Sequence, residues 1–351
     1  MKVAIYSLAK NEAANVPAWE SSCREADVRV VTDTGSSDST VEMLQAAGVT
    51  VHWGCPSPWR WDDAHNLSLM HCPADADVCI RLDMDEILEP GWREALEAAW
   101  AAGTTKLRYW YWWSDHVRFL CDRVHSRTGY RWVGPTHEGL VRWSGEEREA
   151  MSEQLVIRHH RQPGKSHKSD LTLLRRAVEE YPLDARMHWY LARELDYAGD
   201  QEAGEVFRKY LTLAGGTSHE RAYAYRVLAR LEPERSTRRL LQAVIESPRE
   251  PEAYVALAER AYSMEDDVAA LYYARQAIAC HQDNQTHTSD PRAYGEAAPD
   301  MAASAAFRIG RYDEAARHAA EAVRRSPGDQ RLAANAARLG IMKDEPGPKP
   351  W

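Results

Sequence analysis

Two carboxylates two residues apart, Asp83 and Asp85, are the side chains best placed to do chemistry in this 351-residue sequence. They follow the apolar run 77–82, which is typical of a buried strand. Ligands of an open α/β sheet bind at the carboxyl ends of its strands, where this triplet would lie. Carboxylate oxygens there suit Mg²⁺ or Mn²⁺, and such an ion can neutralise a departing diphosphate. An acidic loop in solvent is the alternative interpretation.

The elements that would position this triplet alternate along the first hundred residues. Short apolar runs at 3–8, 28–32, 49–53 and 77–82 predict strands, and helical patterns start near residue 12 and cover 41–47 and 64–70. This alternation is typical of a mostly parallel sheet with crossover helices, that is, an α/β Rossmann-like domain. From 107 to 143 aromatic and β-branched residues predict strands and loops beside the main sheet.

The sequence becomes helical after Asp170, with Ala-rich amphipathic segments separated by Gly, Pro or Asp. The run Gly310 to Ala315, followed by Ala319 and Pro327, resembles the tetratricopeptide signature. We therefore predict three parts: an α/β domain at 1–168, an all-α tetratricopeptide-like repeat domain at 169–341 and a tail at 342–351. A helical bundle without repeats is the alternative for the second part.

Composition excludes several classes of protein. A hydrophobic fraction of 44% and a charged fraction of 28% are ordinary for a soluble protein, and no apolar run approaches the roughly 20 residues that span a bilayer. The six cysteines form no C-x-x-C pair, which argues against a disulfide framework or a structural zinc site. The net charge of −9 is spread over both halves, so no basic domain indicates nucleic acid. We expect a cytoplasmic protein without membrane insertion.

Five stretches carry a resemblance to a known family. The sequence is similar to the family 2 glycosyltransferases of the GT-A fold, particularly the bacterial and phage-type subgroup with tetratricopeptide-like helices after the catalytic domain. The resemblance lies in the stretches 7–12, 33–40, 64–69, 82–88 and 132–138. It implies a metal-dependent, inverting transferase of hexosyl type that uses Mn²⁺ or Mg²⁺ and a nucleotide-sugar donor, with a UDP-sugar favoured.

The resemblance also assigns residues to the donor. Leu8, Asn11 and Glu12 would border the nucleotide, and Asp33 would accept a hydrogen bond from N3–H of a uracil base. Asp33 could instead belong to a turn before a helix capped by Ser39 or Thr40.

Two more pairs of residues complete the donor site. Asp83 would face the ribose or the metal, and Asp85 would be the principal metal ligand. His65 and Asn66 stand where the family has Arg-Asn, so a titratable histidine would replace a pyrophosphate-binding arginine.

Inverting transfer needs a base that takes the proton of the acceptor hydroxyl. Glu138 is the first candidate and Asp115 the second. Glu138 could alternatively be a structural carboxylate paired with Arg131 or Arg142. For a further metal or diphosphate contact we choose His159, in preference to two other histidines, His160 and His137.

The acceptor is predicted as a hydroxyl on a macromolecule. Aromatic and basic residues alternate from 107 to 132, and the stretch 156–168 is basic, so either could bind sugars or nucleotides. Protein or glycan ranks ahead of hydroxymethylated pyrimidines in DNA because the chain is acidic. The alternatives of other classes are a catalytically silent helical-repeat scaffold and a nucleotidyltransferase. The sequence leaves the sugar and the oligomeric state open.

Overall fold

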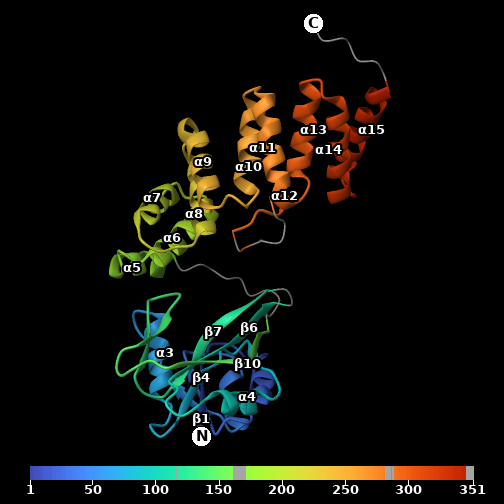
Figure 1. Ribbon diagram of the computed structural model, residues 1–351. Helices are drawn as coiled ribbons and strands as arrows, with labels where there is room; N and C mark the ends of the chain where they lie inside the picture. The colour runs from blue at the N-terminus through green and yellow to red at the C-terminus, as the bar shows by residue number, and fades with distance from the viewer. Residues whose placement is uncertain (115–116, 161–170, 281–285, 287, 345–351) are drawn as a thin grey trace. The chain divides into compact units, whose positions relative to one another are not determined.

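A computed structural model describes the chain except for residues 115–116, 161–170, 281–285, 287 and 345–351 and the side chains of residues 340–344. The chain divides into two units, Met1–Glu180 and Tyr181–Trp351, each of which has its own core (Figure 1). The boundary predicted at 168/169 lies outside the described residues.

The N-terminal unit contains ten strands and five helices within its described residues. The strands are β1 (Val3–Ala9), β2 (Val28–Asp33), β3 (Thr50–Trp53), β4 (Val78–Arg81), β5 (Glu86–Leu88), β6 (Lys106–Ser114), β7 (Val117–Ser126), β8 (Tyr130–Val133), β9 (Gly139–Arg142) and β10 (Glu149–His159). The helices are α1 (Val16–Ser22), α2 (Thr40–Ala46), α3 (Trp61–Met70), α4 (Trp92–Ala99) and α5 (Leu171–Glu180).

Eight strands form one mixed sheet in the order β3-β2-β1-β4-β7-β6-β10-β5. Strands β1 to β4 are parallel, as the alternation of elements predicts. The prediction that residues 107–143 lie beside the main sheet is wrong for β6 and β7. Strand β7 pairs antiparallel with both β4 and β6, so these strands extend the main sheet, and only β8 and β9 form a separate ribbon.

The central strands are buried on both faces because alternate side chains enter two different cores. Val3 and Ile5 pack with residues of α1, α2 and α4 on one face. Ala4 and Tyr6 face Leu69 of α3 and Trp132 of β8 on the other. The sheet therefore presents its strand ends, rather than its faces, as the place for a ligand.

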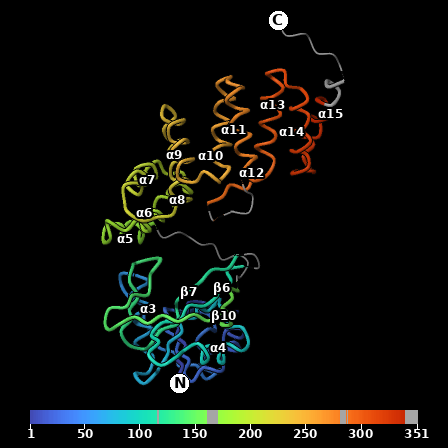
Figure 2. The backbone as a smooth tube through the Cα atoms, in the orientation of Figure 1, coloured from blue at the N-terminus to red at the C-terminus, as the bar shows by residue number. Residues whose placement is uncertain are grey.

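The C-terminal unit is all-helical in its described residues. It contains α6 (Ala185–Tyr197), α7 (Ala203–Thr212), α8 (Ser218–Leu231), α9 (Ser236–Glu246), α10 (Glu252–Ser263), α11 (Asp267–Ala279), α12 (Pro291–Tyr294), α13 (Ala297–Arg308), α14 (Tyr312–Arg325) and α15 (Gln330–Asp344), with a short 3₁₀ turn at Pro233–Arg235. Consecutive helices pack side by side, as in α8 with α9, α10 with α11 and α13 with α14 (Figure 2). Among the described helices, none combines the length and the apolar character that a bilayer-spanning helix requires.

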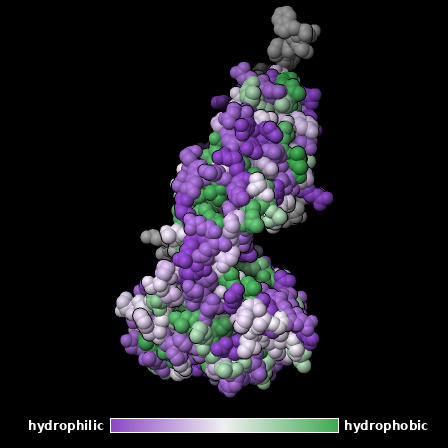
Figure 3. Space-filling model, turned by 90° about the vertical axis from the view of Figure 1, so that its left-hand side faces the viewer, coloured by the Kyte–Doolittle hydropathy of each residue, from purple (hydrophilic) through white to green (hydrophobic). Residues whose placement is uncertain are grey.

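Small side chains make this close packing of helices possible. Ala258, Ala270, Ala274, Ala302 and Ala305 are buried together in one cluster between α10, α11 and α13. A methyl group lets two helix backbones approach closely, so neighbouring helix pairs share a continuous core. On the face shown in Figure 3 the surface is largely hydrophilic, with hydrophobic residues in scattered patches.

Candidate active site

The acidic triplet lies directly after β4, as predicted, at the carboxyl end of a buried strand. The loops that follow β1 and β2 end at the same edge, because β1 pairs in parallel with both β2 and β4. Asp83 and Asp85 keep 30% and 32% of their side-chain surface exposed. Both carboxylates are therefore open to a ligand at the edge where α/β sheets bind ligands.

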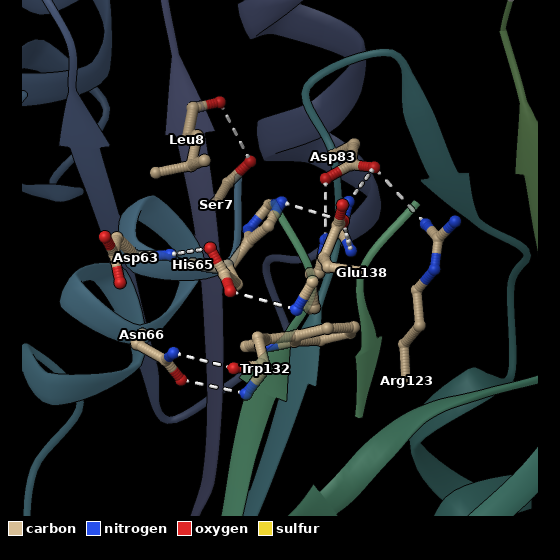
Figure 4. Close-up of polar contacts among 12 residues, drawn as sticks. Ser7, Leu8, Asp63, His65, Asn66, Asp83, Arg123, Trp132 and Glu138 are labelled. Atoms are coloured by element: carbon tan, nitrogen blue, oxygen red, sulfur yellow. Dashed lines mark hydrogen bonds and ion pairs between the residues drawn. The ribbon is translucent and has the colours of Figure 1, made fainter. Parts of the chain in front are cut away.

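Two arginines hold the Asp83 carboxylate. Arg81 donates from Nε and Nη2 to its two oxygens over 3.1 and 3.0 Å, and Nη1 of Arg123 lies 3.3 Å from Oδ2 (Figure 4). Burial disfavours the ionised carboxylate, but the attraction of Arg81 and Arg123 outweighs it and keeps the pKa of Asp83 well below its ordinary value. Asp83 is thus an ionised group whose charge is already compensated.

Asp85 has a different neighbour, His159 at the end of β10. Nε2 of His159 lies 3.4 Å from Oδ2 of Asp85, and this contact raises the pKa of the imidazole above its ordinary value. The His159 ring also stacks on Trp113, with centroids 4.3 Å apart. His160 meets Asp85 only through its backbone N–H, so of this adjacent pair it is His159 that brings its side chain to the triplet.

The residue types at this place fit a hard divalent cation. A carboxylate and an imidazole are ligands that Mn²⁺ accepts, and Mg²⁺ commonly binds one or two carboxylates while diphosphate oxygens and water complete its shell. Within the described residues no three His, Cys, Asp or Glu side chains converge in metal-binding geometry.

Glu138 approaches Asp83 through a shared partner, Arg81. Nη1 of Arg81 donates to Oε1 of Glu138 over 2.7 Å, and Nε2 of His65 lies 3.3 Å from the same oxygen. Burial raises the pKa of Glu138, but Arg81 and His65 outweigh burial and lower that pKa to about 2. Glu138 is paired with an arginine, as the structural alternative states, but that arginine is Arg81 and not Arg131 or Arg142.

The two α3 residues assigned to pyrophosphate are turned toward the protein. His65 is 1% exposed and its ring lies near those of Trp61 and Trp132, and burial together with Arg81 lowers the pKa of its imidazole. The side-chain amide of Asn66 makes two hydrogen bonds with the backbone of Trp132. Its nitrogen donates to the carbonyl oxygen of Trp132 over 2.9 Å, and its oxygen accepts from the N–H of Trp132 over 2.8 Å. In this arrangement both residues position β8 instead of facing the open edge.

The loop after β1 is tied to the loop after β2. Asn11 takes a positive φ of 57°, its backbone N–H donates to Oγ of Ser36, and its side-chain oxygen accepts from the N–H of Ser37. Glu12 donates its backbone N–H to Oγ1 of Thr40. Leu8, which was also assigned to the nucleotide, lies on β1 before this loop and is partly buried.

Asp33 shows the geometry of the alternative turn. Its carboxylate accepts from the backbone N–H groups of Gly35 and Ser36, each at 3.0 Å, and its side chain is almost fully buried. Ser39 stands at the N-cap of α2 without a side-chain capping hydrogen bond. The contact of Asp33 with a uracil base stays a prediction that competes with this local role.

Sequence reasoning missed the cations that organise the site. Arg81, Arg123 and the buried Glu86 form one ionic cluster with Asp83, because Nη1 of Arg123 lies 2.7 Å from Oε1 of Glu86. One signal was available: an arginine inside an apolar strand, two residues before an aspartate, must lie on the same face as that aspartate. Asp115, the second candidate base, lies outside the described residues.

The two stretches proposed for the acceptor contain a stacked group of rings and guanidinium groups. Arg118 lies over the rings of Trp110 and Trp112, at 4.4 and 5.5 Å, and Arg158 lies over Trp112 at 4.9 Å. Trp113 is 41% exposed. The basic residues of 161–168 lie outside the described residues.

No family model matches the sequence, and neither does any curated protein. Similar solved structures cover about half of the chain. They include the TPR protein YrrB, described with an unusual peptide-binding site (20% identity, TM-score 0.39, 49% of this chain and 84% of that chain). They also include a thermophilic TPR protein of Thermus thermophilus (20%, 0.31, 49% and 89%) and a tetratricopeptide repeat protein of Parabacteroides merdae (18%, 0.37, 49% and 65%).

Proposed function

We propose that the N-terminal unit is a metal-dependent glycosyltransferase of the GT-A type that uses a UDP-sugar, and that tetratricopeptide-like repeats follow it. The observation that carries the proposal is the position of Asp85, partly exposed at the carboxyl end of β4 and 3.4 Å from His159. Asp85 and His159 would hold Mn²⁺ or Mg²⁺. When bound, the ion would neutralise the UDP leaving group.

The other residues would orient the reactants. Arg81 and Arg123 fix the Asp83 carboxylate, which would then accept a hydrogen bond from the ribose. Glu138 is the proposed base for the acceptor hydroxyl. A carboxylate with a pKa of about 2 takes a proton less readily than one at its ordinary pKa, so this role requires Arg81 to release Glu138 when the reactants bind.

The proposed acceptor is a protein or a glycan, with hydroxymethylated DNA as the alternative. The exposed ring of Trp113, beside His159, could stack on a sugar. Incubation with a panel of nucleotide sugars and these three acceptors, followed by mass spectrometry, would identify the transferred sugar and the acceptor together.

Donor binding gives the direct test. Manganese and UDP together should raise the midpoint of thermal unfolding of the wild-type chain by a few degrees, about what ligand at 100 times its Kd provides. Asp85→Ala should abolish the part of the shift that depends on metal. Asp63→Ala, which removes an exposed carboxylate of α3, is the matched control and should keep the full shift.

The possible outcomes separate the proposals. A wild-type chain that no combination of UDP and divalent cation stabilises would refute donor binding and favour the scaffold alternative. An undiminished metal-dependent shift in Asp85→Ala would remove Asp85 from the metal site while leaving donor binding intact.

A further inference from the structure

A cavity of about 570 Å³ lies within the helical unit. Residues of α6, α8, α9 and α10 line it, together with residues 288–293 at and before α12. Within the described residues, its charged lining consists of Asp196, Arg226, Arg230, Glu252, Glu259, Asp290 and Arg292. Cavities of this volume that combine apolar walls with a few polar groups are the usual form of a ligand site.

Most of these charges already have partners. Arg230 pairs with Asp196, and Arg292 lies 3.4 Å from Glu259. Arg226 donates from Nη2 to the carbonyl oxygen of Thr288 over 2.9 Å. An anionic ligand would therefore have to displace an existing contact of each arginine.

Among the acidic groups of the described lining, Glu252 is the one that is buried. It is 5% exposed, and its Oε1 accepts from the backbone N–H of Asp290 over 3.2 Å. Its other oxygen, Oε2, is buried and has no hydrogen-bond partner among the described residues. A buried carboxylate oxygen without a hydrogen-bond partner destabilises the folded chain, and a hydrogen-bond donor from a ligand would recover that free energy.

The surroundings of Glu252 add negative charge. Burial and the nearby Glu252 raise the pKa of Glu250 and outweigh Arg226, which lowers it, so these two carboxylates lie close enough to repel each other. Tyr197, which lines the same cavity, is 65% exposed and offers an aromatic surface. Aromatic rings attract cations and pack against aliphatic stems. The carboxylate of Glu252 and the ring of Tyr197 therefore both favour a ligand with a positive charge on an aliphatic chain.

We propose that this cavity binds a cationic side chain, a lysine ammonium or an arginine guanidinium, of a partner protein, and that Oε2 of Glu252 accepts its hydrogen bond. Glu252 lies near the start of α10 and Glu259 seven residues later on the same helix. The two carboxylates line one cavity, but Glu259 already forms an ion pair with Arg292. Glu259 therefore provides a matched control.

The test uses the full chain and dye-labelled octapeptides of alternating serine and lysine or serine and arginine, measured by fluorescence anisotropy. Peptides with glutamate or norleucine in place of the basic residue serve as comparison. The basic peptides should bind and the other two should not. Glu252→Gln should weaken binding about tenfold or more, as expected for a charge-assisted hydrogen bond. Glu259→Gln should change it less than about twofold, as for exposed ion pairs.

Glu252→Asp, which keeps the charge, should retain most of the binding, and circular dichroism should show unchanged helix content in all three variants. The proposal is overturned if the basic peptides do not bind, if the glutamate peptide binds equally well, or if Glu252→Gln and Glu259→Gln weaken binding to the same extent. These measurements need neither UDP nor metal, so they are independent of the proposed transferase activity.

Discussion

One guanidinium group, that of Arg81, connects most of the candidate active site. It donates to Asp83 and Glu138 and lies 4.7 Å from the centroid of the Trp132 ring. Arg81 is almost fully buried, so its charge is stabilised by these carboxylates instead of by water. Removal of any one member would leave the others with an uncompensated charge in the interior.

The ion pair of Arg81 with Glu138 predicts a pH dependence of stability. The pKa of Glu138, about 2, lies below its ordinary value of 4.5, so the folded state gains stability above pH 4.5 and loses it as the pH falls toward 2. At 1.36 kcal/mol for each pH unit, the full contribution is on the order of 3 kcal/mol.

Urea unfolding of the wild type and of Glu138→Gln between pH 6 and pH 3 would measure this contribution. The wild type should lose stability relative to the variant as the pH falls. Glu97→Gln, at a half-exposed ion pair with Arg93, is the control and should follow the wild type closely. A constant difference between wild type and Glu138→Gln would show that Glu138 is not held ionised by its partners.

The site could be predicted in part from residue types and order. The positions of Asp83, Asp85 and Glu138 follow from motifs, and these residues do lie around one strand end. The roles of His65 and Asn66 could not be inferred in the same way, because a short helix does not reveal which of its faces meets another strand. Arg81 was missed because an arginine within an apolar run looks like a break in the strand pattern, and the sequence does not show which carboxylates it pairs with.

At the scale of elements, the N-terminal end of α3 holds the loop that delivers Glu138. Asp62 accepts from the backbone N–H of Gly134 over 2.9 Å, and Trp61 donates its backbone N–H to the carbonyl oxygen of Pro135. Asn66, one turn later, clamps the backbone of Trp132. Helix α3 thus fixes both β8 and the turn after it.

Asn66→Ala should therefore destabilise the N-terminal unit by about 2 to 3 kcal/mol, because it removes two hydrogen bonds and leaves two backbone groups of Trp132 without partners. Chemical denaturation checks the magnitude. Asn335→Ala, in the last helix of the other unit, provides a comparison in which the N-terminal transition should not move. A cost below about 0.5 kcal/mol would mean that the clamp has little energetic weight.

The elements themselves were predictable where their pattern is local. The strands predicted from 3–8, 28–32, 49–53 and 77–82 agree with β1 to β4 within two residues at each end. The position of β7 between β4 and β6 was not predictable, because antiparallel pairing of distant strands leaves no periodic signal. Helix α12 could not be predicted, because its four residues are too few to show a helical period.

At the scale of the whole molecule, the chain consists of two units with separate cores, Met1–Glu180 and Tyr181–Trp351. Separate cores predict two unfolding transitions in calorimetry of the full chain. UDP with manganese should raise the temperature of one transition only, since a ligand stabilises the unit that binds it. A single transition that shifts as a whole would show that the two units unfold cooperatively.

The unequal surroundings of the two aspartates have a consequence for the order in which ligands arrive. Arg81 and Arg123 offset the charge of Asp83, whereas the ionic partner of Asp85 within the described part of the chain is His159. Asp85 and His159 alone would give a divalent cation fewer ligands than its coordination shell requires. In the proposed transferase, Asp85 and His159 would therefore receive the nucleotide and its cation as a preformed complex.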